Sequence, residues 1–401
     1  MVNDSMNAFS LPSFEFDDKI LMQGAEISRR LNQLRLENFP PSAKKTLRQF
    51  SVGEVAHYLG VTPSNLKRLY LDGKGPVPTT MSGNRKYYTA EQMLELRQYL
   101  AETGKSEAKR YLPQRKPGDK LQVIAVVNFK GGSGKTTTAA HLAQHLALTG
   151  HRVLAIDLDP QASLSALHGF QPELDQNPSL YDTIRYDERK PIADVILPTN
   201  FPGLDIIPAN LELQEYEYDT PLAMQAGSEG KRFFTRLGKA LMDVDDRYDV
   251  VVIDCPPQLG YLSLTALTAS TSVLITVHPQ MLDLMSMSQF LLMLGNITKT
   301  IKAAGADVRL DWLRYLITRF EPQDVPQVQM LGFMQSMLAE EILKTPMVKT
   351  TAISDAGLTK RSLYELERSN FTRGTYDRAI ECMDAVNFEI QGLIHRAWGR
   401  M

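Results

Sequence analysis

The stretch VVNFKGGSGKTTTAAHLAQHL, residues 126–146, joins an apolar run to a helical run through a glycine-rich loop. A loop directly after a strand and before a helix is the context in which phosphate-binding loops occur. Its backbone N–H groups and the first turn of the helix are suited to hold phosphate oxygens. We therefore expect a nucleotide site in which Lys135 reaches the β and γ phosphates and the Thr136 hydroxyl binds Mg²⁺. Phe129 stands where this motif usually has its first glycine, so the loop is not the ordinary version.

Two carboxylate motifs follow apolar strands further along the chain. VLAIDLDPQAS, residues 153–163, places Asp157 and Asp159 at the end of one strand. YDVVVIDCPPQLG, residues 248–260, places Asp254 at the end of another. Ligands of α/β proteins bind at the carboxyl ends of parallel strands. We therefore expect these aspartates near the nucleotide, with Asp254 as a Walker-B carboxylate for a Mg²⁺-bound water; the alternative is that each aspartate only caps a loop.

Residues 121–401 carry the pattern of one large domain. Short apolar runs rich in β-branched residues alternate there with helical stretches. This alternation predicts βαβ units, and hence an α/β fold with a mostly parallel sheet and helices on both faces, as in a P-loop NTPase. The predicted strands are residues 121–128, 151–157, 204–209, 248–254, 272–278 and 313–320.

Length and composition indicate a globular chain of more than one domain. At 401 residues, with 43% hydrophobic and 22% charged residues, two or three globular domains are expected. The two cysteines, Cys255 and Cys382, are too few and too far apart for a disulfide framework. No apolar run approaches the roughly 18 residues of a membrane span, and the first residues lack a signal-peptide pattern. A cytoplasmic protein is therefore expected.

Charge is unevenly distributed, although the net charge is only −2. Residues 1–120 contain 19 Lys and Arg against 13 Asp and Glu, a difference of +6. The remainder contains 25 against 33, a difference of −8. A basic front joined to an acidic body suggests a module that binds a polyanion, attached to a separate enzymatic domain.

Residues 1–45 are predicted to be a polar tail followed by a helix with a possible role in dimerisation. Between residues 18 and 37, Ile20, Ile27 and Leu34 recur every seven residues, which predicts an amphipathic helix. Such a helix either packs on its own chain or pairs with a second copy, and fewer than three heptads cannot establish a coiled coil.

Residues 46–102 carry signals for two short helices, a hairpin and a third helix. A capping box at Ser51 opens the first helix, Gly60 makes a turn, and Pro63 fits the first position of a second helix. The segment PTTMSGNRKYYT, residues 78–89, then alternates around a Gly-Asn turn as a two-stranded wing does. The pattern predicts a winged helix-turn-helix and resembles that of MerR-type regulators.

This module has basic residues where DNA would be read. The start of the second helix of a helix-turn-helix meets base edges and phosphates, and a wing tip meets phosphate or the minor groove. The alternative is a small packing module whose charges are only solvated. The candidate DNA contacts are Ser64, Asn65, Lys67 and Arg68 in the helix and Arg85 and Lys86 at the wing.

Residues 103–120, TGKSEAKRYLPQRKPGDK, are rich in Lys, Arg, Pro and Gly and show no apolar period. Such a composition is typical of linkers. We therefore interpret the segment as a basic linker between the DNA-binding module and the α/β domain.

Four motifs together resemble those of one superfamily of ATPases. KGGSGKTT (130–137), IDLDPQAS (156–163), IDCPP (253–257) and VHPQ (277–280) occur in this order and spacing. They resemble the deviant Walker-A ATPases of the ParA/MinD/Soj superfamily over about residues 121–395. With a helix and a DNA-binding module in front, the layout is similar to that of the large plasmid-partition ATPases, and among them to the RepA group of repABC-type plasmids.

The resemblance implies a role for each residue of the nucleotide site. Lys130, which an ordinary phosphate loop does not need, matches the signature lysine that reaches the nucleotide of a second subunit. Lys130, Lys135 and Asp159 would be the catalytic residues, with Asp159 orienting the attacking water. Mg²⁺ would be held by Thr136, Asp157 and Asp254. The residues implied to hold ATP are Lys130, Gly131, Gly132, Ser133, Gly134, Lys135, Thr136 and Thr137, with Pro279, Thr318 and Arg319 near adenine unless these three only form a structural turn.

The resemblance also implies a cycle with ATP, Mg²⁺ and DNA. Such proteins form homodimers, bind DNA non-specifically and hydrolyse ATP when a ParB-type centromere-binding protein, here of the RepB kind, stimulates them. The helix-turn-helix would add operator-specific binding and autorepression. The protein would work in the cytoplasm on the nucleoid and without a membrane. Candidate non-specific DNA contacts are Lys349, Lys360 and Arg361.

Three other functions fit parts of the sequence. An ATP-sensing transcriptional repressor would use the same DNA-binding module. A MinD-like membrane-cycling ATPase would use the terminal stretch 388–401, which a helix closing the fold explains as well. An iron-protein-type reductase is disfavoured, because Cys255 adjoins the carboxylate expected at Mg²⁺.

Overall fold

The computed structural model describes residues 15–38, 45–104, 108–128, 130–170, 177–306, 308–358, 360–371 and 373–400. The chain divides into two units, Met1–Lys45 and Thr46–Met401. Phe129 and the tail 1–14, for which the sequence made predictions, lie outside the described residues.

The described residues of the first unit contain the helix α1 (Phe16–Asn38), which confirms a helix over residues 18–37. Glu26 accepts hydrogen bonds from Arg29 at 2.8 Å and from Arg30 at 2.6 Å, one turn away on the same helix. Ile20 and Ile27 are exposed within this unit. The pairing of α1 with a second chain stays a prediction.

The second unit is built on a seven-stranded sheet with the order β10-β9-β4-β8-β5-β7-β6. Neighbouring strands pair in parallel except β6 and β7, which are antiparallel. The expected mostly parallel sheet is therefore confirmed, although the short edge strand β6 is not among the predicted strands. In chain order the strands are β4 (Gln122–Val127), β5 (Val153–Asp157), β6 (Leu197–Pro198), β7 (Leu204–Ile207), β8 (Val250–Asp254), β9 (Ser272–Val277) and β10 (Trp312–Ile317).

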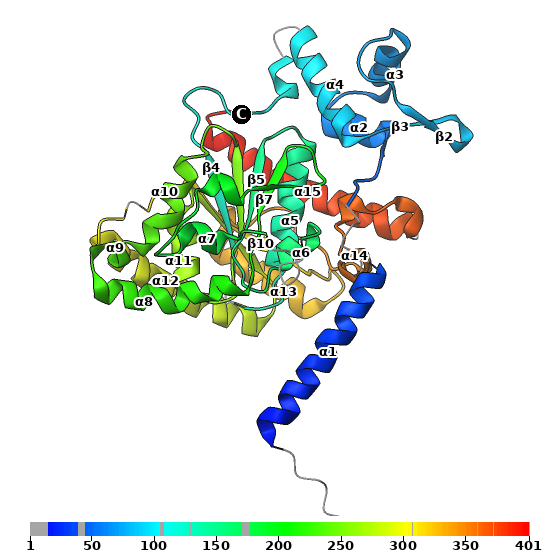
Figure 1. Ribbon diagram of the computed structural model, residues 1–401. Coiled ribbons are helices and arrows are strands. Elements are labelled where there is room, and N and C mark those ends of the chain that lie inside the picture. The colour runs from blue at the N-terminus through cyan, green and yellow to red at the C-terminus, as the bar shows by residue number, and fades with distance from the viewer. Residues whose placement is uncertain are drawn as a thin grey trace, which may run out of the picture. The chain divides into compact units, whose positions relative to one another are not determined.

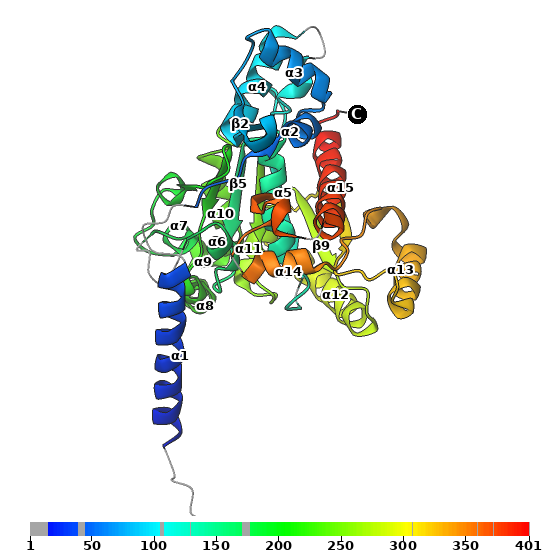
Figure 2. The same ribbon diagram turned by 90° about the vertical axis from the view of Figure 1, so that its right-hand side faces the viewer.

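Helices cover both faces of this sheet, as predicted (Figures 1 and 2). Successive side chains of a strand point to opposite faces, so Ile124 and Val126 of β4 join one apolar layer and Val123 and Ala125 the other. The first layer is completed by α5 (Lys135–Leu148) and α15 (Arg373–Ala397), and the second by α7 (Leu180–Ile184), α10 (Arg236–Met242), α11 (Tyr261–Ala269) and α12 (Met281–Ala303).

Shorter elements fill the connections. The further α-helices are α6 (Ser163–Leu167), α8 (Glu215–Ala226), α9 (Ser228–Lys231), α13 (Val325–Leu338) and α14 (Thr351–Leu358). The 3-10 helices are η1 (Ser82–Asn84), η2 (Ala108–Tyr111), η3 (Ile192–Val195), η4 (Leu211–Gln214), η5 (Phe233–Thr235), η6 (Ala339–Glu341), η7 (Leu363–Glu365) and η8 (Arg368–Asn370).

The N-terminal part of the second unit has the order of elements expected of a winged helix-turn-helix. Ser51 and Glu54 form the predicted capping box, and Gly60 adopts a left-handed φ of 67° at the turn. Pro63 is the first residue of the second helix, as predicted. The elements are β1 (Phe50–Ser51), α2 (Val52–Leu59), α3 (Pro63–Leu71), β2 (Thr79–Met81), β3 (Arg85–Tyr88) and α4 (Ala90–Thr103), with antiparallel strands in the order β1-β3-β2.

Arg97 of α4 fixes this part to the α/β domain. The side chain is buried, and its guanidinium donates to the backbone oxygen of Leu148 at 3.0 Å, of Tyr111 at 3.1 Å and of Tyr58. Burial lowers the pKa of Arg97 to about 9. Leu148 is the last residue of α5, the helix that begins at the glycine-rich loop. The two domains therefore share a buried polar contact at the far end of that helix.

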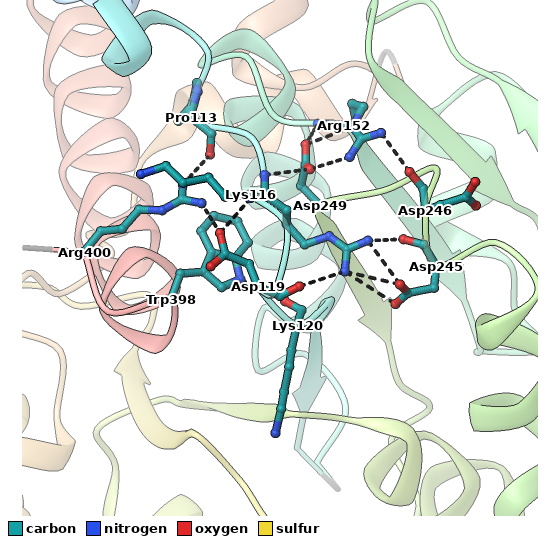
Figure 3. A network of polar contacts seen from close by, with 11 residues as sticks. Pro113, Lys116, Asp119, Lys120, Arg152, Asp245, Asp246, Asp249, Trp398 and Arg400 are labelled. Carbon is teal, nitrogen blue, oxygen red and sulfur yellow. Dashed lines mark hydrogen bonds and ion pairs between the residues drawn. The ribbon is translucent and has the colours of Figure 1, made fainter. Parts of the chain in front are cut away.

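The segment predicted to be a linker is bonded to the α/β domain over its described residues 108–120 (Figure 3). The Arg115 guanidinium donates to the backbone oxygen of Asp245, and the Arg115 backbone N–H donates to the Asp249 carboxylate at 3.0 Å. The Arg400 guanidinium donates to the Asp119 carboxylate. Arg115 therefore serves to hold the segment in place.

The C-terminal stretch closes the fold. Ile390, Leu393, Ile394 and Trp398 are buried in the same apolar layer as α5, and the Trp398 indole donates to the backbone oxygen of Lys120 at 2.8 Å. The apolar face that a membrane-binding helix would need is thus already used in the core. Within the described ranges, no helix is long and apolar enough to cross a bilayer.

Replacing Arg97 by Met should lower the free energy of unfolding by about 2–4 kcal/mol, because three carbonyls lose their donor at a buried site. Urea unfolding of the full chain measures this change. Lys67→Met, at an exposed position, is the matched control and should stay within about 0.5 kcal/mol of the original protein. Equal stability of the two variants would show that Arg97 does not hold the domains together.

Candidate nucleotide site

The glycine-rich loop connects β4 to α5 through two left-handed glycines. Gly132 has a φ of 76° and Gly134 a φ of 85°, conformations that residues with a Cβ rarely adopt. Gly134 directly precedes the first turn of α5, so the helix N-terminus opens onto the loop. An anion bound there is stabilised by the free N–H groups and the dipole of the helix.

Side chains from β9 and from the two residues that follow β10 anchor the backbone of this loop. The Ser133 hydroxyl lies 3.0 Å from the Thr276 hydroxyl, and Thr318 Oγ1 donates to the Ser133 carbonyl at 2.8 Å. Arg319 Nη1 donates to the Gly132 carbonyl at 3.2 Å. Thr318 and Arg319, which the sequence places near adenine, therefore contact the phosphate loop itself.

Lys135 is the buried cation of the site. Its ammonium donates to the Lys130 carbonyl at 3.3 Å. Burial lowers the pKa of Lys135, while the carboxylates of Asp254 and Asp159 oppose this change. The lysine therefore lies among acidic groups at the place where the sequence expects phosphate.

Asp157 and Asp254 end the neighbouring strands β5 and β8 and pair with each other in register. Asp157 Oδ2 accepts hydrogen bonds from the Ser165 N–H at 2.8 Å and the Ser165 hydroxyl at 2.7 Å. Burial, opposed by these bonds, raises the pKa of Asp157 to about 7. The parallel sheet thus places two carboxyl groups side by side with little water to separate their charges.

The Asp254 carboxylate makes fewer hydrogen bonds than that of Asp157. Both carboxylate oxygens are buried and have no hydrogen-bond partner. Burial, and then the charge of Asp157, raises the pKa of Asp254 well above its usual value. The nearby Thr136 hydroxyl lowers this pKa in part, although its geometry is not that of a hydrogen bond. Unsatisfied carboxylate oxygens beside a threonine hydroxyl fit Mg²⁺, which binds through one or two carboxylates together with water and phosphate.

Asp159 lies on the loop after β5, where the sequence expects a group that orients water. It is partly exposed, and its Oδ1 accepts from the Gln161 N–H at 3.0 Å. Its own N–H donates to Asp157 Oδ1 at 3.2 Å, which ties the loop to the strand end. The carboxylate is therefore positioned by the loop and remains open to solvent.

Lys130 has an intramolecular partner that the sequence did not predict. Its ammonium lies 2.7 Å from the Asp283 carboxylate, whose side chain is only 5% exposed, whereas the lysine side chain is 44% exposed. Asp283 lies in the first turn of α12. Pro279, expected near adenine, is buried in the segment between β9 and this helix. The only sequence signal for Asp283 is a carboxylate shortly after the VHPQ motif.

The predicted DNA contacts of the second helix lie on the first turns of α3. Ser64, Lys67 and Arg68 are exposed, and Asn65 is half-buried. Arg68 donates to Asn65 Oδ1 at 3.3 Å, which holds two of the candidate residues together.

The two predicted wing contacts, Arg85 and Lys86, differ in whether the side chain is bonded within the hairpin. Arg85 is exposed at the start of β3. The Lys86 ammonium donates to Thr80 Oγ1 at 2.6 Å and lies 5.0 Å from the centre of the Tyr70 ring. Lys86 is thus partly used within the hairpin.

The predicted C-terminal DNA contacts are also placed unequally. Lys349 pairs with Glu321 at 3.0 Å. Lys360 is half-buried and has a left-handed φ of 50°, and Arg361 is exposed. Their proposed role in DNA binding therefore rests on their charge.

Comparison with known proteins agrees with this geometry. Residues 121–305 match the family described as AAA domain. A Sinorhizobium fredii (strain NBRC 101917 / NGR234) protein named "Putative replication protein A" is 65% identical over 403 residues, covering 98% of this chain and 99% of that protein. Sporulation initiation inhibitor protein Soj of Bacillus subtilis is 32% identical over 235 residues, 59% of this chain and 87% of Soj. Cobyrinic acid a,c-diamide synthase of Mycobacterium smegmatis, solved with an ATP analog and magnesium, is 26% identical with a TM-score of 0.53 and covers 70% of this chain and 97% of that one.

The sheet, the glycine-rich loop and the paired strand-end carboxylates define a P-loop ATPase. The full-length similarity to the replication protein, together with the match to Soj, narrows the class further. The chain belongs to the ParA-type family of plasmid partition ATPases. The resemblance seen in the sequence motifs is thereby confirmed.

Asp254→Asn should make the ligand-free protein more stable at pH 8, with a melting temperature higher by a few degrees. The reason is the raised carboxyl pKa of the strand-end pair, which favours the protonated form in the folded state. The resulting stability is fully present below the ordinary carboxyl pKa of about 3.9 and is lost as the pH rises through the folded-state value. The variant removes one of the two charges that cause this loss.

The same variant should lose most of the extra stabilisation that Mg²⁺ gives with a nucleotide. Thermal unfolding at pH 5 and pH 8, with and without Mg·ADP, measures both effects. Asp205→Asn, in β7 of the same sheet, is the control. A lower melting temperature of Asp254→Asn at pH 8 would contradict the assignment.

Proposed function

We propose that the protein binds ATP with Mg²⁺, pairs into a sandwich dimer that holds DNA, and hydrolyses ATP to release it, so that plasmid copies are segregated. The observation that carries this proposal is the placement of Lys135, Asp157 and Asp254 around one helix N-terminus at the edge of a parallel sheet. Phosphoryl transfer depends mainly on position and charge stabilisation, and these groups supply both.

The roles follow from the local environments. Lys135 and the N–H groups of residues 131–137 would bind the phosphates. Asp254, Asp157 and Thr136 would hold Mg²⁺, which supplies positive charge at the phosphates when bound. Asp159, which remains open to solvent, would orient the attacking water. Thr318 and Arg319 would act by fixing the loop backbone as well as by lying near the base.

Lys130 would make hydrolysis depend on dimerisation. In the single chain its ammonium is held by Asp283, so reaching the nucleotide of a second subunit requires this 2.7 Å contact to break. Pairing of two subunits would supply the competing negative charge of the triphosphate. An isolated subunit would therefore bind ATP and hydrolyse it slowly.

DNA and a protein partner would complete the cycle. Lys349, Lys360 and Arg361 would bind DNA without sequence preference, and α3 with the hairpin β2–β3 would bind an operator and repress the protein's own synthesis. A ParB-type centromere-binding protein of the RepB kind would stimulate hydrolysis on the nucleoid in the cytoplasm. ATPase activity measured with and without DNA and this partner tests the whole scheme, and activity that neither changes would contradict it.

An ATP-sensing transcriptional repressor is the second candidate. The contact of Arg97 with the last residue of α5 favours it, because the helix that starts at the phosphate loop ends against the DNA-binding part. The two functions differ in hydrolysis: a sensor would regulate operator binding without stimulated turnover.

Lys130→Ala should keep ATP binding within about threefold, since the ordinary loop lysine remains, and should reduce stimulated ATPase activity about 100-fold or more, as loss of one charge-stabilising group does. Nucleotide binding by calorimetry and phosphate release measure the two effects. Lys299→Ala, an exposed base of α12, is the control. Turnover equal to that of the original protein would exclude the trans-acting role.

Joint replacement of Ser64, Lys67 and Arg68 by Ala should abolish binding to DNA from the region upstream of the protein's own gene. Binding to unrelated DNA should fall less than about threefold, since base contacts specify and phosphate contacts position. Lys349→Ala with Arg361→Ala should show the reverse pattern. Fluorescence anisotropy at fixed salt separates the two, and equal losses in both variants would show that one surface serves both kinds of DNA.

A further inference from the structure

A cavity lined by basic residues, separate from the phosphate loop, lies between the segment after α7 and the helix α10. It is a cavity of about 710 Å³, within the range of small-molecule pockets. None of its lining residues belongs to the nucleotide loop or to the predicted DNA contacts. The walls are formed by Thr183, Arg189, Lys190, Pro191, Ile192, Arg232, Thr235, Arg236, Lys239, Ala240 and Asp243.

The cavity carries a marked excess of positive charge. Three arginines and two lysines line it, against Asp243 as the one lining acid. Lys190 also pairs with Asp182, behind the wall, at 2.9 Å. Arg232 and Lys239 are exposed. Like charges gathered in a concave site repel one another, so this arrangement favours an anion with several charges.

The Arg236 side chain is held in the cavity wall by contacts within the protein. It is 7% exposed, and its Nε donates to the Ile184 carbonyl at 2.6 Å. A second donor bonds the Arg185 carbonyl, and the guanidinium lies 4.2 Å from the centre of the Tyr186 ring. These contacts hold a positive charge fixed at the end of α7, beside the cavity.

We propose that this cavity binds a small molecule carrying two or more phosphate groups, as a second ligand site separate from the nucleotide loop. Arginine forks match phosphate oxygens in pairs. Five cations less the two acids Asp182 and Asp243 leave three positive charges, more than a single carboxylate or phosphate would neutralise. Duplex DNA is the less suitable occupant, because Arg236 is buried in the wall and a DNA backbone crossing the surface would meet only the exposed lysines and arginines. The proposal does not depend on ATP hydrolysis.

Calorimetric titration of the full chain carrying Lys135→Ala with inorganic triphosphate tests the site. The substitution removes the lysine of the phosphate loop, so the remaining triphosphate binding reports the second cavity. No ADP is added, because its two phosphates would compete there. Binding should weaken with ionic strength and should be stronger for triphosphate than for sulfate. The double variant Arg232→Ser, Lys239→Ser should weaken it about tenfold or more, and Lys120→Ser, an exposed base outside the cavity, should not change it.

Three results would overturn the proposal. The first is no triphosphate binding in the Lys135→Ala protein, which assigns any binding in the original protein to the nucleotide loop. The second is equal binding by the double variant. The third is loss of DNA binding in the double variant without any triphosphate binding in the original protein, which makes these bases part of a DNA surface.

Discussion

The fold places two carboxyl groups at the ends of neighbouring parallel strands, and the rest of the site is arranged around their repulsion. Asp157 and Asp254 are both fully buried, so neither charge is screened by water. Lys135 is the nearest buried cation, and it is itself less stable in its charged form because of burial. Ser165 donates two hydrogen bonds to the Asp157 carboxylate, whereas no hydrogen-bond donor of the described residues reaches the carboxylate of Asp254. A divalent cation with a polyphosphate would supply the missing charge and donors together, which makes the ligand part of the stability of this edge.

Helix α5 connects this edge to the N-terminal part of the second unit, residues 46–102. It has 14 residues, and at about 1.5 Å per residue it spans about 20 Å between the phosphate loop and the contact with Arg97. The described part of the 103–120 segment adds a second attachment through Arg115 and Arg400. Residues 46–102 are therefore held at two places on the domain that carries the phosphate loop.

Most helices and strands of this fold could be predicted from the sequence, because the residue patterns that indicate them are local. The capping box of Ser51 and Glu54, the left-handed Gly60 and the apolar runs of the six main strands all depend on neighbours within a few residues. The contacts that were missed join distant segments: Lys130 with Asp283 across 153 residues, and Arg97 with Leu148 across 51. The basic cavity is also formed by two distant segments, since its lining residues Ile192 and Arg232 lie 40 residues apart in the sequence. The charge, size and capping preference of single residues do not predict contacts between segments that are far apart in the sequence.

The two lysines of the loop differ in a way that matches two separate tasks. Lys135 is buried among carboxylates, so moving it would leave uncompensated charge in the interior and is costly. The Lys130 side chain is 44% exposed, so its ammonium regains water when it leaves the pair, whereas the Asp283 side chain is only 5% exposed. Asp283 lies in the first turn of α12, where the N-terminus of a helix stabilises a carboxylate even when the lysine leaves. Lys130 is therefore the more easily released of the two loop cations, as the proposed pairing with a second subunit requires.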